Sequence, residues 1–192
     1  MPTIEKLKTF FGQREMPVEL VKLCNLQETV GQKFLSDGFG LRQCDTTGIS
    51  TWSTDPEFLD HLIEFAQANG SGSTYAFWLK DPKASLSQQP VVVFGDEGGV
   101  HVVAENILQL LQLLSYDSEP MIDFDKLFFT DNGNHEPSEA LDQYIDWLKD
   151  NFKLDPIDNP DEIVKAAQRK LQKPFKKWLG RFVEGEGDDD DE

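Results

Sequence analysis

The segment 90–114, PVVVFGDEGGVHVVAENILQLLQLL, constrains the fold more than any other part of this chain. Residues 91–94 and 100–104 are short apolar runs rich in β-branched side chains, as is typical of strands. The residues between them, 95–99, are glycines and acids, and glycine tolerates the positive φ angles of a tight turn. The segment therefore predicts a β-hairpin.

A helix is predicted directly after the hairpin. Asn106 is a favourable N-cap residue, because its side-chain oxygen can accept a hydrogen bond from the first helical turn. Isoleucine and leucine fill most positions of 107–114, while Gln109 and Gln112 mark one polar edge. Such a helix must be largely buried against the sheet.

Residues 75–79, YAFWL, form a further predicted strand before the hairpin. This strand, the hairpin with glycine and acidic residues in its turn, and the leucine-rich helix follow one another in an order that resembles the SUKH superfamily. The resemblance covers residues 70–115. The superfamily is named in part for a yeast cell-wall-assembly regulator and is rich in bacterial toxin-immunity proteins. The resemblance implies an α+β domain and supplies no catalytic residues.

The rest of the chain predicts helices and short strands around this centre. Apolar residues recur at helical spacing in the segments 3–12, 18–35 with an interruption at Gly31, 55–70, 138–151 and 161–183. Further strands are predicted within 41–52, with 49–52 as a short candidate, and at 126–130. Pro174 is expected to kink or split the last helix, because its ring removes one backbone hydrogen bond.

We therefore predict an α+β fold, SUKH-like, in which a mainly antiparallel sheet of about 4–6 strands is wrapped by helices. Residues 1–160 are expected to form this domain, with residues 161–183 as a basic amphipathic helix packed on it. Residues 184–192, rich in Gly, Asp and Glu, have nothing to bury and are predicted to be a disordered acidic tail.

The chain is strongly acidic: 35 Asp and Glu against 18 Lys and Arg give a formal net charge of -17. This charge argues against nucleic acid or an anionic membrane as the main ligand, since both select Lys and Arg, and it favours a basic protein partner. Cys24 and Cys44 are too few for a disulfide framework and indicate thiols in a reducing compartment. No signal-peptide core or membrane-spanning apolar run is present in the sequence, so we expect a cytoplasmic protein.

No motif in the sequence indicates an enzyme. A phosphate-binding loop and the dinucleotide fingerprint are both missing, and His61, His101 and His135 are too scattered in the sequence to indicate a metal site. We therefore expect a non-enzymatic protein that needs no cofactor and no metal.

Three carboxylates are predicted to lie in a row on the helix at 138–151. Asp142, Asp146 and Asp150 recur every four residues, which places them about 6 Å apart along one helix face. Like charges at this spacing cost stability, so the row is a candidate partner-binding site. It could imitate the phosphates of a nucleic acid and fill the basic groove of a nuclease. The alternative is a solvated helix face that Lys149 and Lys153 neutralise.

A second candidate acidic rim surrounds the hairpin. Asp96 and Glu97 lie in the hairpin turn, and Asp117 and Glu119 follow the leucine-rich helix. Carboxylates at these positions could contact a basic partner. Ordinary polar turns are the alternative explanation.

Two tryptophans help to decide between a partner-binding rim and ordinary polar turns. Trp52 and Trp78 lie in predicted strands, where large aromatic side chains usually belong to the core. A tryptophan exposed beside the acidic rim would instead be an anchor for a partner.

The last predicted helix favours a different class of ligand. It carries seven cations and an aromatic stripe, which is typical of helices that bind membranes or nucleic acids: Lys165, Arg169, Lys170, Lys173, Lys176, Lys177 and Arg181. The seven acids of 184–192 nearly cancel this charge. Two alternatives follow, that the helix neutralises the acidic body or that the tail covers a basic site.

By resemblance, we predict an immunity protein that neutralises a basic toxin domain, such as a nuclease, by covering its active surface with acidic side chains. The alternative is a regulatory or scaffolding interaction domain without a toxin partner, as the eukaryotic relatives of the superfamily are. A deep pocket with convergent carboxylates or a histidine would instead indicate an enzyme.

Overall fold

The computed structural model describes residues 4–41, 47–130 and 136–186. Its main sheet has five antiparallel strands in chain order: β1 (Gly40–Leu41), β2 (Leu62–Gln67), β3 (Thr74–Trp78), β4 (Val91–Phe94) and β5 (Val100–Ala104). A separate sheet pairs β6 (Pro120–Ile122) with β7 (Leu127–Phe129). The helices are α1 (Ile4–Phe10), α2 (Val18–Val30), α3 (Thr47–Ser50), α4 (Pro56–Asp60), α5 (Ile107–Leu114), α6 (Leu141–Phe152), α7 (Pro160–Leu179) and the 3-10 turn η1 (Leu86–Gln88). The predicted α+β class with a mainly antiparallel sheet is confirmed.

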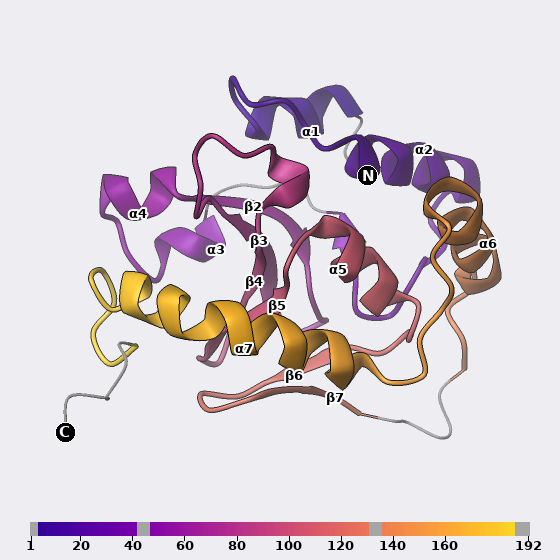
Figure 1. The fold of residues 1–192 in the computed structure, drawn as a ribbon. Coiled ribbons are helices and arrows are strands. Elements are labelled where there is room, and N and C mark those ends of the chain that lie inside the picture. The colour runs from indigo at the N-terminus through magenta and orange to yellow at the C-terminus, as the bar shows by residue number, and fades with distance from the viewer. Residues whose placement is uncertain (1–3, 42–46, 131–135, 187–192) are drawn as a thin grey trace.

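Helices cover both faces of the main sheet. Figure 1 shows α7 on one side of the sheet and α1 and α2 on the other. Alternate residues of β4 divide between two buried clusters: Val91 and Val93 face the cluster that contains α1, α2 and α5, whereas Val92 and Phe94 face the cluster that contains α4 and α7. The central strands are therefore buried on both faces.

The predicted hairpin and the helix that follows it are confirmed. β4 and β5 pair through the turn at 95–99, in which Gly98 and Gly99 have φ angles of 115° and 81°. Asn106 caps α5, because its side-chain oxygen accepts the Gln109 N–H at 3.0 Å. Most of the apolar side chains of α5 are buried.

The helix predicted at 55–70 is wrong beyond its first turns. Asp55 does cap a helix, but α4 ends at Asp60 and residues 62–67 form β2. Since β2 lies between β1 and β3 and is buried on both faces, its apolar residues do not alternate, and such a run resembles a buried helix in sequence. The strand predicted at 49–52 is also wrong, because α3 occupies residues 47–50.

Other boundaries differ less from the prediction. α2 ends where Gly31 interrupts the helical pattern, with a positive φ of 74°. The strand predicted at 126–130 is present as β7, but it pairs with β6, for which no strand was predicted. Residue 3, the predicted start of the first helix, lies outside the described residues.

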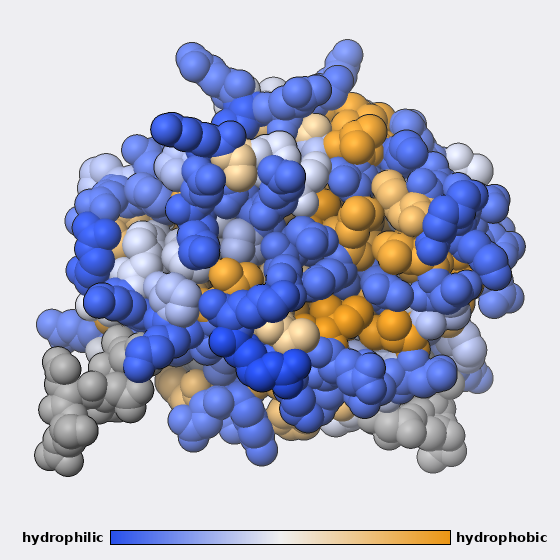
Figure 2. All heavy atoms as spheres, viewed as in Figure 1, coloured by the Kyte–Doolittle hydropathy of each residue, from blue (hydrophilic) through white to orange (hydrophobic). Residues whose placement is uncertain are grey.

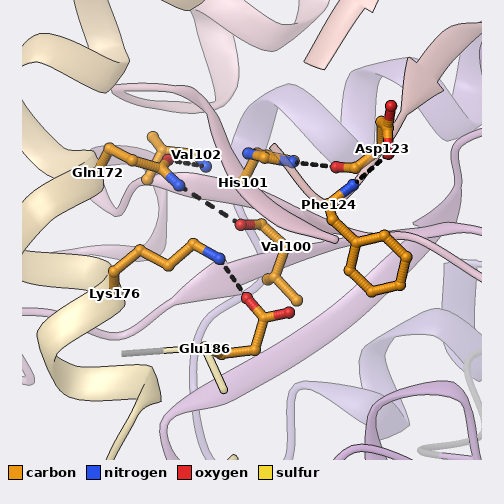
Figure 3. Close-up of polar contacts among 8 residues, drawn as sticks. All are labelled: Val100, His101, Val102, Asp123, Phe124, Gln172, Lys176 and Glu186. Atoms are coloured by element: carbon orange, nitrogen blue, oxygen red, sulfur yellow. Dashed lines mark hydrogen bonds and ion pairs between the residues drawn. The ribbon is translucent and has the colours of Figure 1, made fainter. Parts of the chain in front are cut away.

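α7 is continuous through Pro174, so the predicted split of this helix is wrong. It lies along β5, the edge strand of the main sheet, and two of its glutamines bind the backbone of that strand; Figure 3 shows Gln172. Gln172 Oε1 accepts the Val102 N–H at 2.8 Å, and Gln168 Nε2 donates to the Val102 carbonyl at 3.3 Å. Side chains of α7 thus bind backbone groups of β5 that would otherwise pair with another strand. No helix in the described part of the chain is long and apolar enough to cross a membrane.

The first residues after α7 fold back on this helix. Glu186 is buried and forms an ion pair with Lys176 (Figure 3). The prediction that the acidic tail has nothing to bury is therefore wrong for Glu186. Residues 187–192 lie outside the described residues.

Candidate protein-binding surface

The acidic ridge lies on the outer face of α6. Its three carboxylates are exposed: Asp142, Asp146 and Asp150. On the opposite face Tyr144 and Leu148 are buried, and the Tyr144 hydroxyl donates to the Leu111 carbonyl in α5 at 2.6 Å. The structure thus brings the three predicted residues together on a helix that is firmly attached to the body.

The lysines that were expected to neutralise the ridge contact other groups. Lys149 Nζ lies 3.4 Å from a carboxylate oxygen of Asp155, and Lys153 Nζ donates to the backbone carbonyl of Asp150 at 3.1 Å. Among the residues that the structure describes, no ridge carboxylate forms an ion pair. The ridge therefore presents its negative charge to solvent.

Two members of the predicted rim, Asp96 and Glu119, meet at the loop between β2 and β3. The Ser73 and Ser71 hydroxyls donate to Asp96 Oδ1 at 2.6 and 2.8 Å, and these bonds, that of Ser73 above all, lower the pKa of Asp96. The Gly70 N–H donates to Glu119 Oε1 at 2.6 Å. Both carboxylates are thus held in fixed positions at this end of the sheet.

Asp117 does not lie on the rim, which corrects the prediction. Its side chain is buried, at 6% exposure, and joins two loops that are distant in sequence. Oδ1 accepts the Asp37 N–H at 2.7 Å and the Ser138 hydroxyl at 2.6 Å, while Oδ2 accepts the Ser138 N–H at 2.8 Å. The carboxylate therefore has a structural role between the segment before β1 and the segment before α6.

The fourth rim residue, Glu97, is exposed in the hairpin turn, and the residue after it contacts an aromatic side chain for which no role was predicted. Gly98, the residue after Glu97, packs against the ring of Phe124 in the β6–β7 turn. Phe124 is 63% exposed. The sequence signal that could have found it is a large apolar residue between two aspartates in a short turn, DFD.

The two tryptophans lie in different environments. Trp78 is buried in β3, as predicted for a core residue. Trp52 follows α3 instead of lying in a strand, and its ring packs edge-on against Phe94 with centroids 5.6 Å apart. It is half-buried and lines a hollow of about 450 Å³ together with Asp96. Trp52 thus lies beside the acidic rim.

The cations of α7 are largely paired with acids of the same chain. Among the residues that the structure describes, the helix and the turn after it form the ion pairs Lys165–Asp161, Lys170–Glu105, Lys176–Glu186 and Arg181–Glu57. Glu57 and Glu105 belong to the body of the domain. This arrangement supports the alternative in which the helix neutralises the acidic body. Figure 2 shows the hydrophilic side chains that cover α7 and the hydrophobic residues that gather between α5, α6 and α7.

Histidine and cysteine side chains in the described part of the chain lie apart from one another. His101 is buried, and His61 Nδ1 lies 2.8 Å from the Glu57 carbonyl oxygen. Burial raises the pKa of the Cys24 thiol to about 11, so this cysteine is a poor nucleophile. His135 and Cys44 lie outside the described residues, and within these residues no three His, Cys, Asp or Glu side chains are grouped as metal ligands.

Comparison with known proteins gives no match: no family model, curated protein or solved structure is similar to this chain. The SUKH resemblance therefore stays a prediction from residues 70–115.

Proposed function

We propose that this chain is a non-enzymatic acidic binding protein, and that it is an immunity protein which neutralises a basic toxin domain, such as a nuclease. The proposal depends on a difference between the cations of α7 and the carboxylates of α6. Cations of α7 are engaged by acids of the same chain, whereas the ridge carboxylates of α6 face solvent without an ion pair among the described residues. The SUKH resemblance supports a toxin as the partner.

Occlusion is the proposed mechanism of neutralisation. Carboxylates spaced about 6 Å apart can take the positions of phosphates in a basic substrate groove, and the negative field of the chain steers the encounter. Since α6 is fixed by the Tyr144 hydrogen bond, the ridge needs no rearrangement before binding. A cytoplasmic location belongs to the proposal, and the free thiol of Cys24 is consistent with it.

A pull-down with the tagged protein from its native cells tests the class of partner. Bound proteins are washed at low and then at high salt, because a mainly electrostatic complex dissociates as salt rises. Recovery of a basic toxin domain that the purified protein inhibits in solution establishes immunity. Recovery of a stable partner without a toxin domain would instead favour the regulatory or scaffolding alternative.

Charge reversal tests the ridge as the contact surface. The double variant Asp142→Lys with Asp146→Lys is expected to weaken binding of the recovered partner by about tenfold or more, because each lysine repels the basic surface. The matched control is Glu15→Lys with Asp60→Lys, which changes the net charge equally at exposed positions away from α6. An equal loss of affinity in both variants would show a general charge effect, and an unchanged dissociation constant in the ridge variant would exclude the ridge.

A further inference from the structure

We infer that the β6–β7 turn carries the aromatic anchor of the partner-binding surface, and that the partner presents an apolar pocket ringed by Lys or Arg. The anchor is Phe124. This inference rests on the proposed function, because it adds an aromatic contact with the same basic partner to the acidic ridge of α6.

The β6–β7 hairpin exposes apolar side chains that the fold does not use. Phe124 is 63% exposed and Met121 is 48% exposed. Met121 lies directly opposite Phe128 in the hairpin, so these two side chains share one face. Phe124 lies in the turn between the two strands and is the more exposed of the two residues, so it is the apolar group of this hairpin most available to a partner.

The backbone beneath Phe124 is held rigidly (Figure 3). His101 Nε2 lies 2.7 Å from the Asp123 carbonyl oxygen, which links the turn to the core strand β5. The Phe124 N–H donates to Asp123 Oδ1 at 2.7 Å. Binding through this residue therefore loses little conformational entropy.

The hairpin turn of the main sheet is shaped to receive Phe124. A Cβ atom on Gly98 would lie 2.4 Å from the Phe124 ring, and one on Gly99 would lie 2.2 Å from the Asp123 carbonyl oxygen. Only glycine permits this approach, since real Cβ contacts are longer. The two turns thus form one unit, in which the far end of the ring lies against Gly98 while most of the side chain stays exposed.

Acidic residues adjoin the anchor and its Gly98 contact along the chain. Asp123 and Asp125 flank Phe124 in the chain, and Glu97 adjoins Gly98. The nearby Lys126 lies over the Phe128 ring, 5.0 Å from its centroid. An aromatic residue within a charged rim is the usual anatomy of an interface centre. Because the rim and the whole chain are negative, the complementary partner is basic, and a second copy of this chain would be repelled.

A matched control exists elsewhere in the molecule. Phe34 is 64% exposed, almost the same as Phe124, but it adjoins Lys33 and lies with Glu28 beside a hollow of mixed charge. If exposure alone decided binding, Phe34 and Phe124 would contribute equally. We expect instead that only Phe124 binds the basic partner.

The test uses two synthetic peptides of equal charge, acetyl-Arg-Leu-Arg-Leu-Arg-Leu-Arg-amide and the same peptide with serine in place of leucine. Each is titrated at low salt into the isotope-labelled full chain, and backbone amide shifts are followed by NMR. The leucine peptide is expected to bind about tenfold more tightly and to shift the amides of residues 95–99 and 121–126. Phe124→Ala should remove this advantage, Phe124→Leu should keep most of it, and Phe34→Ala should leave it unchanged.

The outcomes separate this inference from the proposed function. Equal affinity of the two peptides, with shifts confined to α6, would overturn the anchor and leave a basic partner for the ridge. No binding of either peptide at low salt would overturn both. An equal loss in Phe124→Ala and Phe34→Ala would also overturn the anchor, because it would show general hydrophobic contact.

Discussion

At the residue scale, His101 connects the core of the molecule with the turn that carries Phe124. Burial lowers the pKa of His101, and three charged groups act on it from neighbouring elements: Asp123, Lys176 and Glu186. The folded protein therefore favours the neutral imidazole. Protonation places a charge in a buried position between β5 and the β6–β7 turn.

This environment predicts a pH dependence of stability. Because the folded-state pKa of His101 lies below the unfolded value of 6.5, its contribution is fully present above that value and is lost as the pH falls below it. Between about pH 7.5 and pH 5.5 the wild type should lose more unfolding free energy than His101→Gln, which keeps a donor and does not titrate. Urea unfolding at both pH values measures the difference, and parallel losses in the two proteins would contradict it.

Carboxylates of the predicted rim show how one residue type takes different roles. Asp117 is buried and holds two loops, Asp96 is fixed by serine hydroxyls, and Glu97 is exposed without such bonds among the described residues. All three are acids in turns next to predicted elements. Their sequence positions did not distinguish them, because the partners of Asp117 and Asp96 come from segments far along the chain.

At the element scale, α7 completes the edge of the main sheet. An exposed edge strand can pair with another chain and aggregate, and natural proteins cover such edges. Here Gln168 and Gln172 cover β5 by binding the Val102 backbone and, through Gln172 Nε2, the Val100 carbonyl at 3.4 Å. The helix is therefore part of the sheet's hydrogen-bond network as well as its apolar cover.

Removal of one of these amides should expose the edge. Gln172→Ala leaves the buried Val102 N–H without its acceptor, which should cost about 2 kcal/mol of stability and speed hydrogen exchange at Val102. Gln143→Ala, the same change at an exposed position of α6, is the control and should have little effect. Thermal unfolding and amide exchange measure both, and similar results for the two variants would show that the bond contributes nothing.

The boundary between α4 and β2 shows a second effect at this scale. The apolar residues from Phe58 to Ala66 fit a helical spacing, yet the chain leaves the helix after Asp60. β2 pairs with β3 over most of its length, from Leu62 opposite Trp78 to Gln67 opposite Thr74. Strand pairing outweighs the local helical pattern because it provides hydrogen-bond partners for the backbone N–H and C=O groups of a segment that is buried on both faces.

At the scale of the whole molecule, charge is distributed unevenly in a chain of net charge -17. The basic helix is tied to the acidic body through Lys170–Glu105 and Arg181–Glu57, and to the turn after α7 through the pair of Lys176 with the buried Glu186. Acidic groups on α6 and the hairpin turn remain at the surface. Because several cations of α7 are already paired, the charges that a partner meets on the surface are mainly acidic.

Truncation tests whether the tail stabilises this arrangement or covers a basic site. A chain that ends at Val183 loses Glu186, and the unpaired, half-buried Lys176 should lower its stability by about 1 to 2 kcal/mol relative to a chain that ends at Glu186. Neither chain should be retained by heparin, because Lys170 and Arg181 keep their acidic partners. Urea unfolding measures the stability difference, and heparin chromatography measures the binding of polyanions. Strong retention of the shorter chain alone would show that the tail covers a polyanion site.

By itself the sequence determined the α+β class, the β4–β5 hairpin, the cap of α5 by Asn106 and the acidic row on α6. Each of these depends on short-range spacing, which periodicity and capping chemistry report directly. Tertiary structure alone decided that residues 62–67 form a strand, that Asp117 is buried and that Phe124 is exposed over Gly98. These outcomes depend on which distant segments pack together, and long-range contacts leave no regular pattern along the chain.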